Sequence, residues 1–140
     1  MTTIFSRIIA GELPGRFVWR DERAVGFMSI APLRPGHTLV VPVAEVDHWI
    51  DLEPDLATHL MSVAQTVGKA VDAVFTPVKV GLMLAGLEVP HTHLHVVPIS
   101  GVHDLDFANA DTSAAGDEIE AAAERIRRAL RDLGVAEVSE

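Results

Sequence analysis

The chain has 140 residues, of which 49% are hydrophobic and none is cysteine, and its formal net charge is −9. This length and apolar content predict one folded domain, and the missing cysteines exclude disulfides, thiolate metal sites and a cysteine nucleophile. The negative charge repels phosphate backbones, so we expect no nucleic acid partner. No apolar run approaches the roughly 18 residues of a membrane span, and the first residues lack a signal-like pattern, so we expect a cytoplasmic location and no membrane association.

The first thirty residues predict a short helix followed by a hairpin. Thr2 or Thr3 can cap a helix that Gly11 stops. Two β-like runs, 17–20 and 24–30, are separated by three charged residues. Such a short charged link between two runs predicts an antiparallel pair of strands.

The middle of the chain predicts a strand, a long helix and another strand. His37 opens a β-branched run that ends at Pro42, and Pro54 suits the first turn of a helix that ends at 76–77. A strand is predicted over 78–85. The apolar stripe of the helix follows a spacing of three and four residues: Leu56, Leu60, Val63, Val67, Val71 and Val74.

The last third predicts a turn over 86–90, a strand over 91–99 and, after a polar stretch over 100–116, a helix over 117–133. Acidic residues early and arginines late in that helix suit its dipole, and Gly134 can end it. Strands joined by short links, with helices beside them, predict an α+β fold with an antiparallel sheet.

Three histidines occupy alternate positions in the run HTHLHVV. Because side chains alternate between the faces of a strand, His91, His93 and His95 are predicted to share one face, with Leu94 and Val96 pointing into a core on the other. A cluster of imidazoles on one face is typical of an active site, since groups that titrate near neutral pH gather where they do chemistry.

Three roles are open to this cluster. Metal binding is less favoured, because three residues of one flat strand do not converge easily on one ion, and we expect no metal and no cofactor. Phosphoryl or nucleotidyl transfer is favoured, because one imidazole can attack phosphorus while its neighbours donate to the oxygens and to the leaving group. A purely structural role suits a lone histidine better than three beside His37.

The remaining histidines and the tryptophans suggest no chemistry. His48, His59 and His103 lie in polar or helical contexts, and we expect them at the surface. Trp19 and Trp49 are expected to pack rather than to stack on a ligand.

The chain resembles the histidine triad (HIT) family in three blocks of sequence. These are the triad run itself, P-G-H-T-L-V-V-P over 35–42, and T-I-F-S-R-I-I-A-G-E-L-P near the start. The short opening helix is similar to the Hint-like branch rather than to the galactose-1-phosphate uridylyltransferases. The resemblance covers about residues 3–100 of a single HIT domain spanning 1–140 and leaves 101–140 as a C-terminal extension.

The resemblance implies an α+β, HIT-like fold with a five-stranded antiparallel sheet and two main helices, to which the C-terminal helix is added. It also implies a homodimer. It assigns the nucleophile to His93, phosphate binding to His95, support of the His93 ring or protonation of the leaving group to His91, and pairing with the triad to His37. The positions that match the purine pocket hold Ile4, Phe5, Ile8 and Leu39.

The chain departs from the family pattern before the triad. The positions of the usual Asn, Gly and Gln hold Val80, Leu82 and Leu87. A phosphate-contacting hydroxyl is replaced by Glu88, whose carboxylate repels phosphate unless it turns away or is protonated. The usual ribose-binding acid is replaced by Ser29, which can still form a hydrogen bond.

The structural zinc site of some bacterial members is also absent from the sequence. Its cysteine positions hold Thr3 and Ser6, and a later histidine position holds Glu45. We therefore expect packing to replace the metal in holding this region together.

These observations lead to one main hypothesis and two alternatives. The main hypothesis is a hydrolase or transferase that cleaves a purine nucleoside phosphoramidate or a related adenylyl compound through a nucleotidyl-histidine. The first alternative is a nucleotide-binding protein with a weakened or lost catalytic site. The second is an interaction protein whose acidic stretch over 104–120 contacts a partner, although a packed terminal helix explains that stretch more simply.

Overall fold

The computed structural model describes residues 2–140 and has the predicted α+β fold. Its five strands form one antiparallel sheet in the order β1-β2-β3-β5-β4. The strands are β1 (Phe17–Arg20), β2 (Ala24–Met28), β3 (Thr38–Pro42), β4 (Lys79–Met83) and β5 (Leu94–Ile99). The helices are α1 (Ile4–Ile9), α2 (Pro54–Phe75) and α3 (Gly116–Asp132), with short 3₁₀ turns η1 (Trp49–Asp51), η2 (Val102–Leu105) and η3 (Phe107–Asn109).

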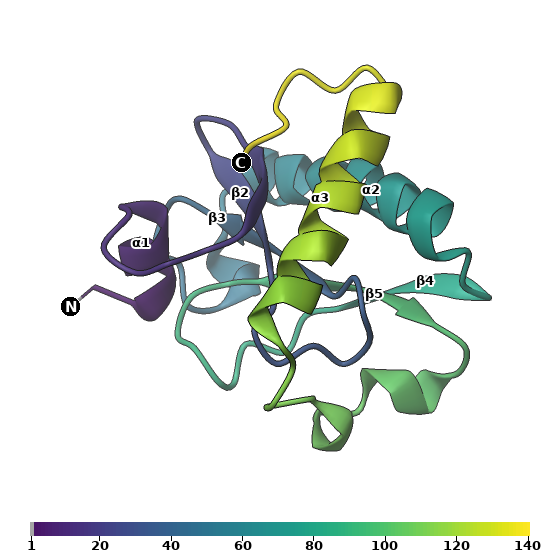
Figure 1. Ribbon diagram of the computed structural model, residues 1–140. Coiled ribbons are helices and arrows are strands. Elements are labelled where there is room, and N and C mark those ends of the chain that lie inside the picture. The colour runs from purple at the N-terminus through teal and green to yellow at the C-terminus, as the bar shows by residue number, and fades with distance from the viewer. Residues whose placement is uncertain (1) are drawn as a thin grey trace.

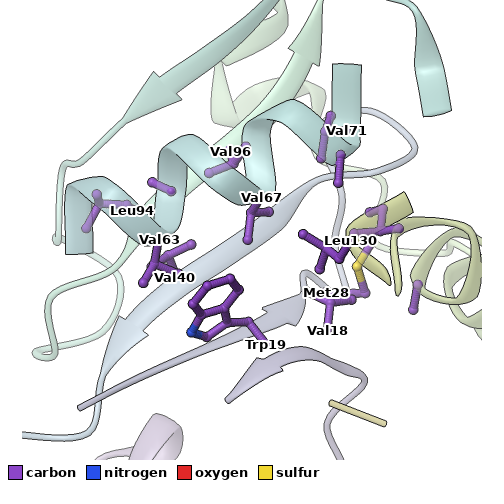
Figure 2. Packing of buried hydrophobic residues seen from close by; sticks show 14 of the residues in the cluster. Val18, Trp19, Met28, Val40, Val63, Val67, Val71, Leu94, Val96 and Leu130 are labelled. Carbon is purple, nitrogen blue, oxygen red and sulfur yellow. The ribbon is translucent and has the colours of Figure 1, made fainter. Parts of the chain in front are cut away.

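The two faces of the sheet carry separate apolar clusters. Helices α2 and α3 cross each other on one face (Figure 1), and their buried residues pack with Val40, Leu94 and Val96 of the central strands (Figure 2). On the other face, Leu39 packs with Phe5 of α1 in a smaller cluster. Because Leu39 and Val40 are neighbours on β3, strand alternation alone sends them to opposite clusters. The α1 face is the one on which the candidate site lies.

The predicted strand over 91–99 begins three residues later than expected. Strand β5 starts at Leu94, so of the triad only His95 lies within it. The sheet ladder with β3 stops at the pair formed by Val40 and Leu94. Before that point the Thr92 amide donates to the Val46 carbonyl at 2.7 Å, because a loop replaces the neighbouring strand there. The three histidines are also buried, with at most 4% exposure, rather than displayed on an open flank.

Other boundaries differ by one or two residues from the sequence prediction. Strand β2 ends at Met28, because the chain then turns and the Ser29 amide donates to the His37 carbonyl. Helix α1 begins as predicted, with the Thr3 side chain accepting from the Ser6 amide. Trp49 is 50% exposed in η1, so the prediction that it packs was wrong.

The C-terminal segment covers one edge of the sheet. Val138 forms a bridge with Trp19 of β1, and the buried guanidinium of Arg127 on α3 donates to the carbonyls of Phe17 and Ser139 at 2.7 and 3.0 Å. These bonds satisfy the open edge of β1, which would otherwise be available to another chain. Across residues 2–140, none of the helices combines the length and the apolar character that crossing a membrane requires.

Candidate active site

A cavity of about 470 Å³ opens between α1, the central strands and the loop before β5. This volume lies in the range of small-molecule sites, and its walls are mainly apolar with polar groups gathered at one end. The structure places ten of the predicted site residues on this cavity or against it. Nine of them line it: Ile4, Phe5, Ile8, Ser29, His37, Leu39, Glu88, His93 and His95.

His93 presents one ring nitrogen to the cavity. Its Nδ1 lies 2.7 Å from the carbonyl oxygen of His91. A carbonyl can only accept, so Nδ1 carries the hydrogen and donates it. The Phe5 ring packs edge-on against the imidazole at 4.9 Å between centroids, which helps to fix its plane. Nε2 is therefore the nitrogen left for chemistry at the polar end of the cavity.

A relay of hydrogen bonds fixes the tautomer of His95. The amide of Leu33 donates to Nδ1 of His37 at 3.0 Å, so His37 carries its hydrogen on Nε2. That Nε2 donates to Nδ1 of His95 at 2.9 Å. His95 must then carry its own hydrogen on Nε2, an atom with no hydrogen-bond partner among residues 2–140. The relay thus aims a donor into the cavity, where it can bind an anionic oxygen.

Burial keeps both members of this relay neutral. Desolvation, followed by the charges of the neighbouring imidazoles, lowers the pKa of His37 to about 3. Desolvation and then the charge of His93 lower the pKa of His95 to about 4, against a smaller opposing effect of Glu88. Both rings therefore act near neutral pH as neutral imidazoles with one fixed donor each.

His91 does not line the cavity, and both of its nitrogens are engaged. Nε2 donates to the Pro42 carbonyl at 2.7 Å, and Nδ1 accepts from the Thr3 hydroxyl, also at 2.7 Å. Desolvation lowers the pKa of His91, although the bond to Pro42 opposes this effect. Of the two roles that the family resemblance assigns to His91, the structure thus fits support of His93 and not protonation of a leaving group.

Glu88 turns into the site rather than away from it. Its Oε1 lies 2.8 Å from His93 Nε2 and 3.3 Å from His95 Nε2, although 43% of the side chain is exposed. Partial burial raises the pKa of the carboxyl, but the hydrogen bond from His93 and the nearby imidazoles outweigh this effect and leave the pKa below its ordinary value. The carboxylate therefore lies against the Nε2 atoms of both imidazoles.

Within residues 2–140, Glu88, His93 and His95 are the one group of three side chains whose ligand atoms converge closely enough to hold a metal ion. The relay disfavours this use. A metal needs the lone pair of His95 Nε2, but that atom carries the hydrogen as long as His37 accepts from the backbone amide of Leu33. With that hydrogen in place, His95 Nε2 is a hydrogen-bond donor and not a metal ligand.

The positions of the family's structural zinc site hold a hydrogen-bonded cluster that does not fit zinc. The Thr3 amide donates to Glu45 at 2.8 Å, and the Thr3 hydroxyl donates to His91. A hydrogen bond from Ser6, and then the one from the Thr3 amide, lower the pKa of Glu45. The cluster ties α1 to the triad through polar contacts, which add to the packing of Phe5 and Ile8 that the sequence predicts for this region.

The unusual leucines and valine before the triad lie away from the cavity. Val80 and Leu82 lie on the edge strand β4, beside α2, and Leu87 is 92% exposed. Ser29 lines the cavity, and its hydroxyl accepts from the Ala31 amide at 3.2 Å.

Sequence reasoning missed the contribution of the C-terminal extension. Phe107 of η3 stacks edge-on against His95 at 5.1 Å between centroids, and Phe107 and Ala110 line the cavity. The one phenylalanine in the stretch over 100–116 was the available signal.

Comparisons with known proteins find histidine triad proteins both by sequence and by structure. The sequence model of the HIT domain matches residues 10–102. The chain is 30% identical over 106 residues to "Protein hit" of Bacillus subtilis strain 168, covering 72% of this chain and 73% of that protein. It is 31% identical over 85 residues to an asymmetrical bis(5'-nucleosyl)-tetraphosphatase of Schizosaccharomyces pombe, covering 57% and 47% of the two chains. The structure resembles a zinc-bound histidine triad family protein from Mycobacterium smegmatis, with a TM-score of 0.82, 26% identity and 96% of both chains covered.

Proposed function

The chain belongs to the HIT domain family, and we propose that it is a nucleotide hydrolase or transferase that forms a nucleotidyl intermediate on His93. Family membership and the tetraphosphatase relative support nucleotide hydrolysis in general. We propose that the substrate is a purine nucleoside phosphoramidate or a related adenylyl compound. The short helix α1 supports a place in the Hint-like branch.

The observation that carries the proposal is the pair of ring nitrogens at the polar end of an apolar cavity. His93 has its Nδ1 hydrogen committed to a backbone carbonyl, which leaves Nε2 as the nucleophile. His95 offers a fixed Nε2 hydrogen beside it. Apolar walls from Phe5, Ile8 and Leu39 suit the two faces of a purine base.

The proposed reaction has two steps. The lone pair of His93 Nε2 attacks the α-phosphorus, the bond to the leaving group breaks, and the leaving group takes up a proton. His95 donates to a non-bridging oxygen, where negative charge grows in the transition state. Water then attacks the phosphorus, the bond between phosphorus and nitrogen breaks, and the nucleoside monophosphate leaves.

Replacement of the nucleophile tests this function. We expect His93→Asn to abolish turnover of a fluorogenic adenosine phosphoramidate while the far-ultraviolet circular dichroism stays unchanged. In the wild-type protein, rapid acid quench and mass spectrometry should find one nucleotidyl group on the peptide that contains His93. Turnover by His93→Asn at the wild-type rate would exclude His93 as the nucleophile.

A second candidate function is nucleotide binding without turnover. The observation in its favour is the carboxylate of Glu88, which lies 2.8 Å from the His93 nitrogen that the proposed reaction uses and would repel a phosphate there. Calorimetry with AMP and GMP, beside the turnover assay, separates the two functions. Binding without turnover would favour this candidate, and the absence of both would contradict both functions.

We also propose that the protein is a homodimer that pairs through strand β4. This strand is an edge of the sheet, and its exposed Leu82 lines the same surface groove as Met61 of α2, which is 54% exposed. Exposed apolar edge strands invite pairing with a second chain. We expect sedimentation to give a dimer for the wild type and a monomer for Leu82→Lys, with Ile50→Lys as an exposed control. A monomeric wild type at micromolar concentration would contradict the dimer.

The net charge of −9 supports one further part of the proposal. We expect no binding of duplex DNA or RNA, which a gel-shift assay at low salt tests. We place the activity in the cytoplasm, and cell fractionation tests this location.

A further inference from the structure

We propose that Glu88 is the general acid and base of this site, giving a proton to the leaving group and later taking one from the attacking water. This role rests on the proposed function, because it presupposes a nucleotidyl intermediate on His93. The family resemblance places a hydroxyl at this position, so the role belongs to this chain's own carboxylate.

The first argument is the proton that lies between Glu88 and His93. Nδ1 of His93 already donates to a carbonyl, and Nε2 lies 2.8 Å from Oε1 of Glu88. A carboxylate and an unprotonated ring nitrogen are both acceptors, so a hydrogen bond between them needs one shared proton. The nucleophile becomes active only when that proton moves to Glu88.

The second argument is the direction from which Glu88 approaches. Its oxygen lies on the Nε2 side of the imidazole, where the attacked phosphorus must come. In an in-line displacement the leaving group departs on the side of phosphorus opposite the nucleophile. A phosphoryl group that enters between them therefore pushes the carboxylate outward, towards the leaving group. The 43% exposure of the side chain leaves room for this movement.

The third argument is the state of the other titratable groups on the cavity. His95 and His37 carry fixed hydrogens on Nε2, and the Nδ1 atom of each ring already accepts a hydrogen bond in the relay, so neither ring has a free nitrogen to take up a proton. His91 is buried with both nitrogens bonded. Arg16 also lines the cavity, but a guanidinium offers hydrogen-bond donors and no acceptor for a proton. Glu88 is the remaining group that can exchange a proton with solvent and touch the reacting atoms.

The proton balance closes over the two steps. Glu88 takes the shared proton from Nε2, the lone pair of Nε2 forms the bond to phosphorus, and the leaving group departs with the electron pair of its broken bond and the proton of Glu88. In the second step the Glu88 carboxylate takes a proton from water, whose oxygen bonds to phosphorus. The electron pair of the broken phosphorus–nitrogen bond returns to Nε2, and the proton returns to its shared position.

Two substrates with the same nucleoside and different leaving groups test this role. An alkylamine phosphoramidate of adenosine needs a proton for its leaving group, whereas the p-nitrophenyl ester of AMP does not. In Glu88→Gln we expect kcat/KM for the amidate to fall about 10²–10⁴-fold, the usual contribution of general acid catalysis. The ester should still release a burst of one p-nitrophenolate per site, followed by a slow phase, because hydrolysis of the intermediate lacks its base.

Glu22→Gln, an exposed carboxylate in the β1–β2 turn, is the matched control and should behave as wild type. Nitrogen-15 spectra of the histidines provide a readout without substrate. In the wild type, His93 should carry one proton on Nδ1 and a second one that lies on Nε2 or is shared with Glu88. In Glu88→Gln, His93 should carry a proton on Nδ1 alone. Equal losses for amidate and ester, no loss, or a gain in activity would each overturn the role of Glu88 and leave the hydrolase standing. A wild type inert towards both substrates would contradict the proposed function itself, and the catalytic role with it.

Discussion

Nε2 of His37 lies 2.9 Å from Nδ1 of His95, and this contact joins a loop amide to the donor that faces the cavity. The two residues are 58 positions apart in the chain and come from segments that lie side by side in the sheet. The contact decides which nitrogen of His95 carries hydrogen, and with it how the site can bind an anion.

Removing His37 should slow the reaction without weakening nucleotide binding to the same extent. In His37→Phe the Nδ1 atom of His95 loses its donor, so the ring can adopt the other tautomer and withdraw the Nε2 hydrogen. We expect kcat to fall about tenfold or more, the value of one hydrogen bond in the transition state, with a smaller change in KM. Steady-state kinetics check this, with His59→Gln on α2 as control. An unchanged kcat would show that the relay does not position His95.

Acid should destabilise the fold through the buried histidines. An unfolded histidine has a pKa near 6.5. In the folded protein, the pKa is about 3 for His37 and about 4 for His95. Between these limits the unfolded state binds more protons, so stability falls as the pH falls from about 6.5 towards 4. We expect a loss on the order of 2–5 kcal/mol in the free energy of unfolding over this range.

Urea unfolding at a series of pH values measures this loss. His37→Phe should have a shallower pH dependence than the wild type, and His48→Gln, at an exposed histidine, should follow the wild type. If His37→Phe and the wild type show the same slope, the burial of His37 does not contribute to the pH dependence.

Arg127 should hold the C-terminal segment on β1. In Arg127→Met the carbonyls of Phe17 and Ser139 lose a buried donor, and we expect the free energy of unfolding to fall by about 2–4 kcal/mol. Limited proteolysis should then cut near residue 138 first, while kcat changes little because α3 does not reach the reacting atoms. Arg128→Met, at the exposed neighbour, is the control. Equal stability of the two variants would contradict this anchoring role.

Thr3 should couple α1 to the triad. Thr3→Ala removes the cap of α1 and the hydroxyl that donates to His91, and we expect it to cost about 1–3 kcal/mol of stability. Because α1 supplies Ile4, Phe5 and Ile8 to the cavity wall, KM for the nucleotide should rise. Thr2→Ala is the neighbouring control. A stable Thr3→Ala variant with unchanged KM would show that the cluster of Thr3, Glu45 and His91 is dispensable.

The sequence by itself determined most of the fold, because the signals for its elements lie within a few residues of one another. The cap at Thr3, the apolar stripe of α2 and the alternation of Leu94 and Val96 with His95 are local patterns, and the structure has each of them. The triad run together with its flanking blocks also identified the family correctly.

The tertiary structure alone decided where β5 begins, which way Glu88 turns and what covers the edge of β1. Each of these depends on a partner outside the local segment: the loop carbonyl of Val46 opposite Thr92, the nitrogen of His93, and the carbonyl of Phe17, which lies 110 residues from Arg127. Periodicity and capping act over one or two turns of chain, whereas a side chain's direction depends on which distant acceptor or donor the fold brings within about 3 Å of it.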